Sequence, residues 1–332
     1  MNNYNYNCKD HSLLLPYLNK YIFRIIHKIV PYQLPANLLT IFSIIIMNLV
    51  FIYYIFFETS NKYSTLFATF CIITYVILDH LDGLQAKITK TSSALGEFLD
   101  HYSDVYNSAI IIYLLFTTLK INLDFYFFLI LWFNFMAFAI VYVEQRETNQ
   151  LIFEKFGSLE GVIIVIVIMT LCLSERILNF WSSVFIFSQP NYIILVIGFI
   201  LGSLSTSARS LLRIGKIPID FILFIILGSS ITIFCTLSTF SWYLSFIIIT
   251  LYSSYYILRS MCCHLIGYTK KYPDLLIILV YLFIYLLYYS GINNIEISII
   301  IWCYSLILFI KILVSVINIF YHLRSKWVWI NK

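Results

Sequence analysis

Four aspartates stand close together in an otherwise apolar stretch of this 332-residue sequence. Asp79 and Asp82 are three residues apart and Asp100 and Asp104 four apart, so each pair lies on one face of a helix. The short loop predicted at 87–95 makes the two helices antiparallel neighbours, and the carboxylate pairs can then face each other. Because an aspartate at the centre of a span costs about 2.5–3.5 kcal/mol, we expect the four to face a polar cavity or to share a cation.

Carboxylate ligands of this kind favour hard divalent cations. Mg²⁺ and Mn²⁺ bind a couple of carboxylates together with substrate phosphates. The small residues Gly83, Ala86 and Gly96 continue the two faces and would let a phosphate approach the backbone. For any single aspartate, a helix cap at the membrane edge is an equal alternative. All four together with their small neighbours favour a metal and phosphate site.

The spacing from Asp79 to Asp104 resembles the signature of the CDP-alcohol phosphotransferases. That signature is D-x2-D-G-x2-A-R-x8-G-x3-D-x3-D, and every spacing is met here. Lys87 stands where the family has arginine, which keeps the charge but loses the bidentate fork. The resemblance implies that Asp79, Asp82 and Asp100 hold two divalent ions, with Asp104 as a further ligand or general base.

Other stretches are similar to the eukaryotic choline/ethanolamine phosphotransferases. Leu95-Gly-Glu-Phe-Leu-Asp-His101 is similar to their LGE-x-x-DH stretch, and Arg259 and His264 have their R-x4-H spacing. The residue after His101 departs from that pattern, since Tyr102 replaces a glycine. Before the first span, the subfamily's Pro-Asn is Pro-Ala-Asn here, and the chain is short for the subfamily.

The resemblance implies substrate-binding roles for residues around the aspartates. Lys87 would contact the diphosphate or the cytidine. Glu144 and Glu160 are candidates for contact with the choline or ethanolamine headgroup, although a loop charge is an equal alternative for Glu144 and a lesser one for Glu160. Arg259 and His264 would contact the nucleotide, although a membrane-surface arginine is an equal alternative for Arg259. The full predicted set is Asn37, Gly83, Ala86, Lys87, Gly96, Glu144, Glu160, Arg259 and His264.

The implied reaction is attack of a lipid hydroxyl on the alcohol-side phosphate of a CDP-alcohol, with CMP leaving. CDP-choline or CDP-ethanolamine would enter from the cytosol and diacylglycerol from the leaflet. Asp104 is the first candidate for the base. Because a carboxylate beside a cation keeps a low pKa and is a poor base on its own, His101 is the second candidate, with a hydrogen-bonded histidine at the membrane interface as an equal alternative. His80 points off the face of Asp79 and Asp82, so we expect a structural role for it.

The composition places this chain in a membrane. Apolar residues make up 61% and charged residues 11%, far from the soluble averages of about 45–50% and about 25%. The long apolar runs predict an all-α polytopic protein with ten spans rather than a β-barrel. The predicted spans are 37–57, 64–86, 97–119, 124–143, 159–174, 190–212, 218–236, 240–258, 274–290 and 296–320.

The basic residues orient the predicted spans. Seventeen lysines and arginines fall on the N-terminal side and three on the far side, with Lys311 near the end of the last span. The positive-inside rule then places both termini in the cytoplasm. Tyr17–Val30 is amphipathic, with Lys20 and Arg24 on its basic face, and predicts a helix lying in the headgroup layer before the first span.

We divide the predicted chain into three parts. Residues 1–36 form a polar N-terminus and the amphipathic helix, 37–212 a catalytic core of about six spans, and 213–332 the four C-terminal spans and a basic tail. The seven cysteines are odd in number and mostly within apolar runs, so we expect small buried hydrophobes rather than disulfides or a metal site.

Three alternatives remain beside a choline or ethanolamine phosphotransferase. A family member with another alcohol or lipid acceptor usually has about six spans. A cation channel or transporter would need polar residues deep in other spans, and a non-catalytic relative would follow from Lys87. We expect no nucleic-acid partner, leave a homodimer open, and take the endoplasmic reticulum from the resemblance alone.

Overall fold

The fold of this chain is known from a computed structural model. The structure describes residues 7–57, 61–186, 189–238, 240–268, 274–290 and 294–323. The predicted basic tail, with Arg324, Lys326 and Lys332, lies outside these residues.

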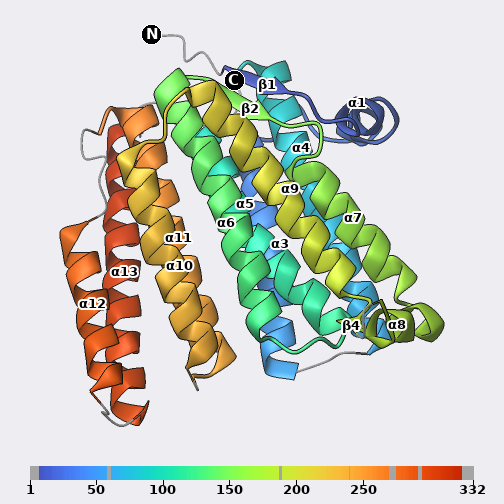
Figure 1. Cartoon of the computed structure of the whole chain (residues 1–332). Coiled ribbons are helices and arrows are strands. Elements are labelled where there is room, and N and C mark those ends of the chain that lie inside the picture. Colours follow the sequence, from blue (N-terminus) through green and yellow to red (C-terminus); the bar gives the residue numbers. More distant parts are fainter. Residues whose placement is uncertain are drawn as a thin grey trace. The chain divides into compact units, whose positions relative to one another are not determined.

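The described chain is almost entirely helical (Figure 1). Four short strands form two two-stranded sheets, β1 with β2 and β3 with β4, and none of them was predicted from the apolar runs. The elements in order are β1 (Cys8–Asp10), α1 (Leu15–Leu18), the π-helical turn η1 (Asn19–Phe23), α2 (Arg24–His27), α3 (Ala36–Phe57), α4 (Lys62–Thr89), α5 (Ala94–Thr118), α6 (Phe125–Thr148), β2 (Leu151–Phe153), α7 (Ser158–Leu171), α8 (Glu175–Ser182), β3 (Val184–Ile186), β4 (Gln189–Pro190), α9 (Ile193–Ile214), α10 (Ile219–Leu237), α11 (Trp242–Ile266), α12 (Leu275–Tyr289) and α13 (Asn294–Leu323).

Several of these helices can span a bilayer, so the chain is an integral multi-pass membrane protein. Each of the ten predicted spans coincides with a helix. Within the described residues, however, seven helices are long and apolar enough to cross a membrane, or eight if α7 and α8 form one span. Ten spans are therefore not confirmed, and the cytoplasmic placement of both termini stays a prediction.

Three local features account for the lower number. α5 carries Glu97, Asp100 and Asp104 in its first half, which makes it too polar by composition. α7 and α8 are bent by 116° at the break between them. α12 has 15 residues, and a span needs about 20. Apolar runs in the sequence indicate which segments are hydrophobic, but they do not show where a helix bends or ends early.

The hairpin between α4 and α5 is tighter than predicted. α4 continues to Thr89 and ends at Lys90, whose φ of 57° is left-handed. Ser93 then caps α5, with its Oγ accepting a hydrogen bond from the Gly96 amide at 3.0 Å. The connection is therefore 90–93 rather than 87–95.

The chain divides into two compact units. The first comprises the described residues within Met1–Asn122, Ile152–Gly202 and Leu323–Lys332, and the second those within Leu123–Leu151 and Ser203–His322. In the first unit, α3 packs along α4 and α5, and α7 packs against the same two helices. The three-part division predicted from the sequence stays a prediction.

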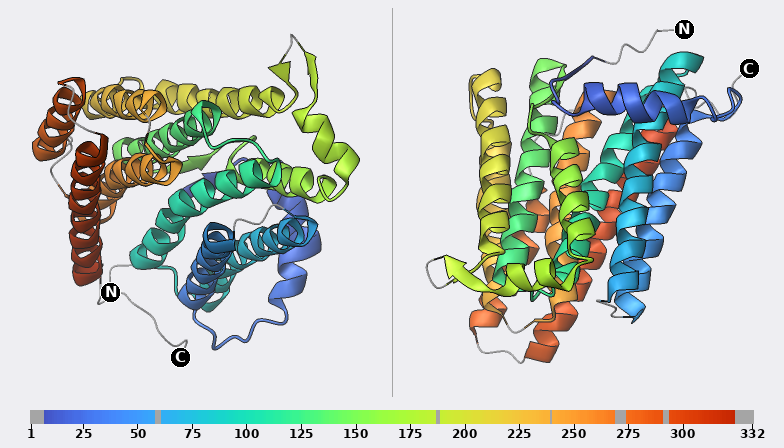
Figure 2. Two further views of the ribbon diagram at one scale, coloured as in Figure 1. Left: turned by 90° about the horizontal axis from the view of Figure 1, so that it is seen from below. Right: turned by 90° about the vertical axis from the view of Figure 1, so that its right-hand side faces the viewer.

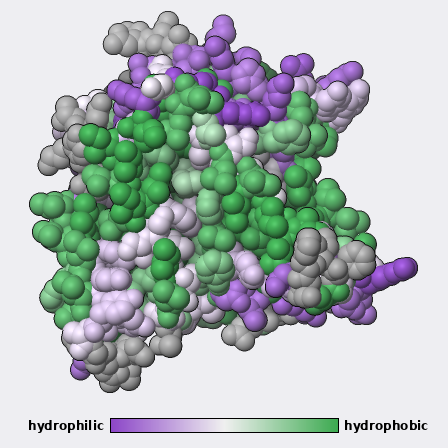
Figure 3. Space-filling view, in the orientation of Figure 1, coloured by the Kyte–Doolittle hydropathy of each residue, from purple (hydrophilic) through white to green (hydrophobic). Residues whose placement is uncertain are grey.

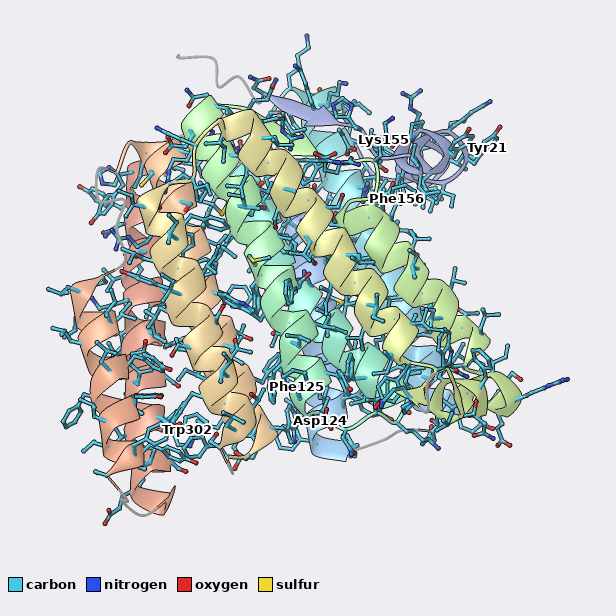
Figure 4. All side chains as sticks on the ribbon, viewed as in Figure 1. Tyr21, Asp124, Phe125, Lys155, Phe156 and Trp302 are labelled. Carbon is cyan, nitrogen blue, oxygen red and sulfur yellow. The ribbon has the colours of Figure 1, made fainter. Side chains whose placement is uncertain are left out.

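A helical segment lies across the end of this first bundle. It runs over Leu15–His27, where an amphipathic helix was predicted, and crosses the axes of α3 and α4 (Figure 2). Tyr21 is 60% exposed and points away from the bundle, and Phe156, in the turn before α7 with Lys155, is 69% exposed (Figure 4). Aromatic side chains exposed at such an end are typical of a membrane interface.

The outer surface of the helices is apolar. On the face in Figure 3, hydrophobic side chains cover the flanks of the helices and hydrophilic ones gather at helix ends. Among the described residues, the side chains of Ile226 and Leu201 are 61% and 60% exposed. A surface of this kind is suited to contact lipid.

The second unit has an aromatic core with buried charges. The Phe224 ring stacks on Tyr256 at 4.2 Å and on Tyr252 at 5.6 Å between ring centroids. Arg146 donates to both carboxylate oxygens of Asp220, at 2.7 Å and 3.2 Å, and the Tyr256 hydroxyl donates to the same group at 2.9 Å. These bonds offset the cost of burying the ions.

All seven cysteines are free, but the prediction that they are buried is wrong for Cys303, which is exposed, and for Cys8 and Cys263, which are half-buried. Cys71, Cys172, Cys235 and Cys262 are buried. They pack as small hydrophobic side chains in the helices.

A steric test of the second unit is available at Gly228. A Cβ there would lie 2.0 Å from the Trp132 ring. Gly228→Ala is therefore expected to destabilise the protein by ~1–3 kcal/mol, the usual cost of overpacking a core, and to lower the thermal unfolding midpoint in detergent. Gly202→Ala is the matched control, because its Cβ would meet no atom within 4 Å. An unchanged midpoint for Gly228→Ala would contradict this packing.

Candidate active site

The four aspartates predicted from the sequence come together in the first unit. Asp79 and Asp82 lie on α4, and Asp100 and Asp104 lie on α5. Asp79 is within hydrogen-bonding reach of Asp100 and of Asp104, and Asp82 interacts electrostatically with the other three. The α4–α5 hairpin thus brings the two pairs of aspartates into one cluster, as their spacing predicted.

Each carboxylate of the cluster also has a polar neighbour other than an aspartate. Thr40 on α3 donates a hydrogen bond to Asp82 Oδ2, and the Tyr75 hydroxyl donates to Asp104 Oδ1 at 2.7 Å. The Nδ1 atoms of His80 and His101 lie 3.4 Å from Asp79 and 3.6 Å from Asp100, respectively.

The sequence reasoning missed Thr40 and Tyr75. Tyr75 precedes Asp79 by four residues, so helical spacing alone could have placed it on the same face. Thr40 comes from another helix, and no local pattern marks it. Its contact depends on how α3 packs against α4.

The donor set of this cluster fits a divalent cation. Ligand atoms of Asp100, His101 and Asp104 all lie within 4.8 Å of one another. Within the described part of the chain, the four aspartates form no ion pair with a lysine or arginine. Carboxylates this close repel each other, and a hard cation with a preference for oxygen ligands would remove that repulsion.

Open space lies beside the cluster at Gly83. This residue is exposed, and a Cβ added to it would meet no atom within 4 Å. Ala86 is half-buried on the next turn, and Lys87 is exposed. A negatively charged group could therefore reach the α4 backbone beside the aspartates, with Lys87 near by in the sequence.

The space around Gly96 is smaller than the space around Gly83. A Cβ there would lie 3.0 Å from Asn37 Oδ1 and 3.3 Å from Ser93 Oγ. The missing side chain thus lets Asn37, at the start of α3, lie against the first turn of α5. The structure brings these two predicted substrate residues together.

The two glutamates predicted for the headgroup are engaged by the protein itself. Glu144, 0% exposed, lies in the second unit and forms an ion pair with Arg213, whose Nη2 is 2.9 Å from Oε2. Glu160, 4% exposed, lies in the first unit and accepts hydrogen bonds from Ser12 Oγ at 2.6 Å and from the Gly157 amide at 2.9 Å. Headgroup binding by Glu144 and Glu160 stays a prediction.

Arg259 and His264 lie on α11 in the second unit. The Arg259 guanidinium is 5.8 Å from the centre of the Tyr255 ring, a cation–π contact. His264 is half-buried, and its Nδ1 has no hydrogen-bond partner among the described residues. Their predicted contact with the nucleotide stays a prediction.

The sequence of this chain is similar to those of known proteins. Residues 33–203 match the CDP-alcohol phosphatidyltransferase family. An uncharacterised class-I family protein of Schizosaccharomyces pombe is 30% identical over 174 residues, which are 50% of this chain and 45% of that protein. A Dictyostelium discoideum class-I family protein is 29% identical over 221 residues, 61% of this chain and 55% of the relative.

A more distant relative has a named activity. Choline/ethanolaminephosphotransferase 1 of Saccharomyces cerevisiae is 26% identical over 177 residues, 52% of this chain and 45% of that protein. The chain spans about half the length of the curated relatives it matches.

Metal binding gives a direct test of the cluster. Replacing Asp100 by asparagine removes one charged ligand, and we expect this to weaken Mn²⁺ binding at least about tenfold. The measurement is a titration of purified protein with Mn²⁺, followed by electron paramagnetic resonance.

Asp124→Asn is the matched control for this substitution. Asp124 caps α6 with its side chain and lies apart from the four aspartates in the sequence, and asparagine is an equally good cap. Equal Mn²⁺ affinities of Asp100→Asn and Asp124→Asn would exclude the cluster as the metal site.

Proposed function

Because this chain belongs to the CDP-alcohol phosphatidyltransferase family, we propose that it transfers phosphocholine or phosphoethanolamine from a CDP-alcohol to diacylglycerol and releases CMP. Membership in the family and the candidate membrane spans support a membrane transferase that takes a CDP-alcohol substrate, a lipid acceptor and a divalent metal. The observation that carries the proposed transfer chemistry is the cluster of Asp79, Asp82, Asp100 and Asp104 beside the open backbone at Gly83.

The choice of alcohol rests on similarity. The stretch from Leu95 to His101 is similar to that of choline/ethanolamine phosphotransferases, and the yeast choline/ethanolaminephosphotransferase 1 is 26% identical to about half the chain. These similarities support choline or ethanolamine before other alcohols. The endoplasmic reticulum and a homodimer stay predictions.

The cluster would hold the metal and the diphosphate together. Asp79, Asp82 and Asp100 are the expected ligands, with Asp104 beside them. A divalent ion bound there would neutralise diphosphate charge and favour the departure of CMP. Thr40 fixes one oxygen of Asp82 and Tyr75 one oxygen of Asp104, so these carboxylates are oriented before substrate arrives.

Two residues can accept the proton of the lipid hydroxyl. Asp104 is half-buried and held by Tyr75 at 2.7 Å. His101 is 6% exposed, and its Nδ1 lies 3.6 Å from Asp100. Either group places a base next to the expected metal ligands, where the attacking hydroxyl must lose its proton.

Lys87 supplies positive charge at the end of α4. It is exposed and follows Asp82 by five residues. An ammonium attracts a diphosphate as a point charge, without the two parallel hydrogen bonds of an arginine. We expect Lys87 to contribute to CDP-alcohol affinity rather than to the chemical step.

An assay of the purified protein tests the proposed reaction. With diacylglycerol and Mg²⁺ or Mn²⁺, we expect CMP release from labelled CDP-choline or CDP-ethanolamine, and none after chelation of the metal. Asp100→Asn and Asp104→Asn should each lower the rate by at least about a hundredfold, whereas Asp124→Asn should retain it. Full activity of either cluster variant would refute the site, and turnover of only an inositol-type CDP-alcohol would refute the choice of headgroup.

The substitution Gly83→Ala gives a second test of the site without disturbing the fold. The methyl group of Gly83→Ala meets no protein atom within 4 Å, so the variant should fold normally. Because the methyl occupies the space through which a phosphate would approach, we expect KM for the CDP-alcohol to rise about tenfold.

The matched control is Gly161→Ala on α7, whose Cβ also meets no atom within 4 Å. It should leave KM unchanged. A wild-type KM in Gly83→Ala would mean that the substrate does not pass this face of α4.

A further inference from the structure

A fully buried amide side chain lies on α4, between the aspartates and Lys87. Gln85 is 0% exposed and follows Asp82 by three residues. Burial of an amide is unfavourable unless its donors and acceptor are hydrogen bonded. The residue therefore needs several partners, and the spacing pattern of the aspartates does not explain it.

Gln85 binds a segment far away in the sequence. Its Oε1 lies 2.7 Å from His27 Nε2 at the end of α2. Its Nε2 donates toward the carbonyl oxygens of Leu34 at 2.8 Å, Pro31 at 3.0 Å and Tyr32 at 3.2 Å. One side chain thus joins α4 to the crosswise helical segment and to the loop that leads into α3.

The orientation of the amide follows from these partners. Carbonyl oxygens only accept, so the three around Gln85 require its NH₂ group, and the oxygen must then face His27. Nε2 of His27 in turn carries the proton that it donates. The reversed amide would place an oxygen against three carbonyl oxygens.

The loop held by Gln85 leads directly to the candidate site. Leu34 is followed by Pro35 and by Asn37 in the first turn of α3. Asn37 lies against Gly96 on α5, and one turn further Thr40 donates to Asp82. The start of α3 therefore touches both helices of the cluster.

The crosswise segment has a second attachment to α4. The Phe23 ring, 1% exposed, stacks on the His80 ring at 4.6 Å between centroids, and His80 contacts Asp79. Phe23 and His27 thus fix the segment at two points of α4, one residue after Asp79 and three residues after Asp82. Movement of this segment would therefore shift the start of α3.

We propose that Gln85 is a positioning residue for CDP-alcohol binding, which holds the 27–34 segment so that Asn37 lies against Gly96 beside the cluster. This inference rests on the proposed function. Among the described residues, the side-chain hydrogen bonds of Gln85 all go to this segment and none to the aspartates. Because none of these bonds reaches a carboxylate, its loss acts on Asn37 and the substrate side of the site more than on metal binding.

The test is Gln85→Met, which keeps the length of the side chain and removes all of its hydrogen bonds. We expect the dissociation constant and KM for CDP-choline to rise roughly fivefold or more. The kcat and the Mn²⁺ affinity should stay within about twofold of those of the wild-type protein. Amide hydrogen exchange over residues 27–38 should become faster in the same variant. Calorimetry with CDP-choline and Mn²⁺ measures the binding without turnover.

Gln33→Met is the matched control, because Gln33 lies in the same loop with an exposed side chain. It should change none of these quantities. If Gln85→Met does not fold, His27→Phe, which removes one of the four contacts, should show a smaller rise in KM with the same pattern. Unchanged CDP-choline affinity in the folded variant, or an equal loss of Mn²⁺ binding, would overturn the proposal.

The two proposals fail in different ways. If the unchanged protein binds CDP-choline and Mn²⁺ but releases no CMP, the proposed reaction is wrong while the binding and exchange measurements still decide the role of Gln85. If it turns over CDP-choline and Gln85→Met matches it in affinity and exchange, only the positioning role is wrong.

Discussion

Mutual repulsion among four carboxylates is the constraint on which the first unit depends. Asp79, Asp82, Asp100 and Asp104 lie on two adjacent helices, and in the described residues no lysine or arginine is paired with them. Such a group is unfavourable in a mostly buried position unless a cation binds there. A divalent ion bound to the cluster, as we propose, would offset this cost to folding.

The surrounding structure orients the side chains of the cluster to which we assign the cation. The four-residue connection 90–93 and the Ser93 cap bring the α4 and α5 faces together. Thr40 and Tyr75 orient two of the carboxylates, and Gln85 secures the loop before α3. Rigid neighbours of this kind limit the reorganisation required when substrate and metal bind.

Spacing along the sequence was sufficient to place the aspartates, because helical periodicity and a short loop determine which side chains meet. It also predicted a helix at each of the ten apolar runs. It could not show the bend between α7 and α8, the protein partners of Glu144 and Glu160, or the contacts of Thr40 and Gln85. Those depend on packing between elements distant in the sequence, which periodicity does not record.

The most direct test of this account is an experimental structure of the purified protein with Mn²⁺ and CDP, with anomalous diffraction used to locate the metal. We predict anomalous density between α4 and α5, within about 2.0–2.6 Å of oxygens from Asp79, Asp82, Asp100 or Asp104, and the diphosphate beside Gly83. Manganese bound elsewhere in the chain, with these four carboxylates free of metal, would contradict the account.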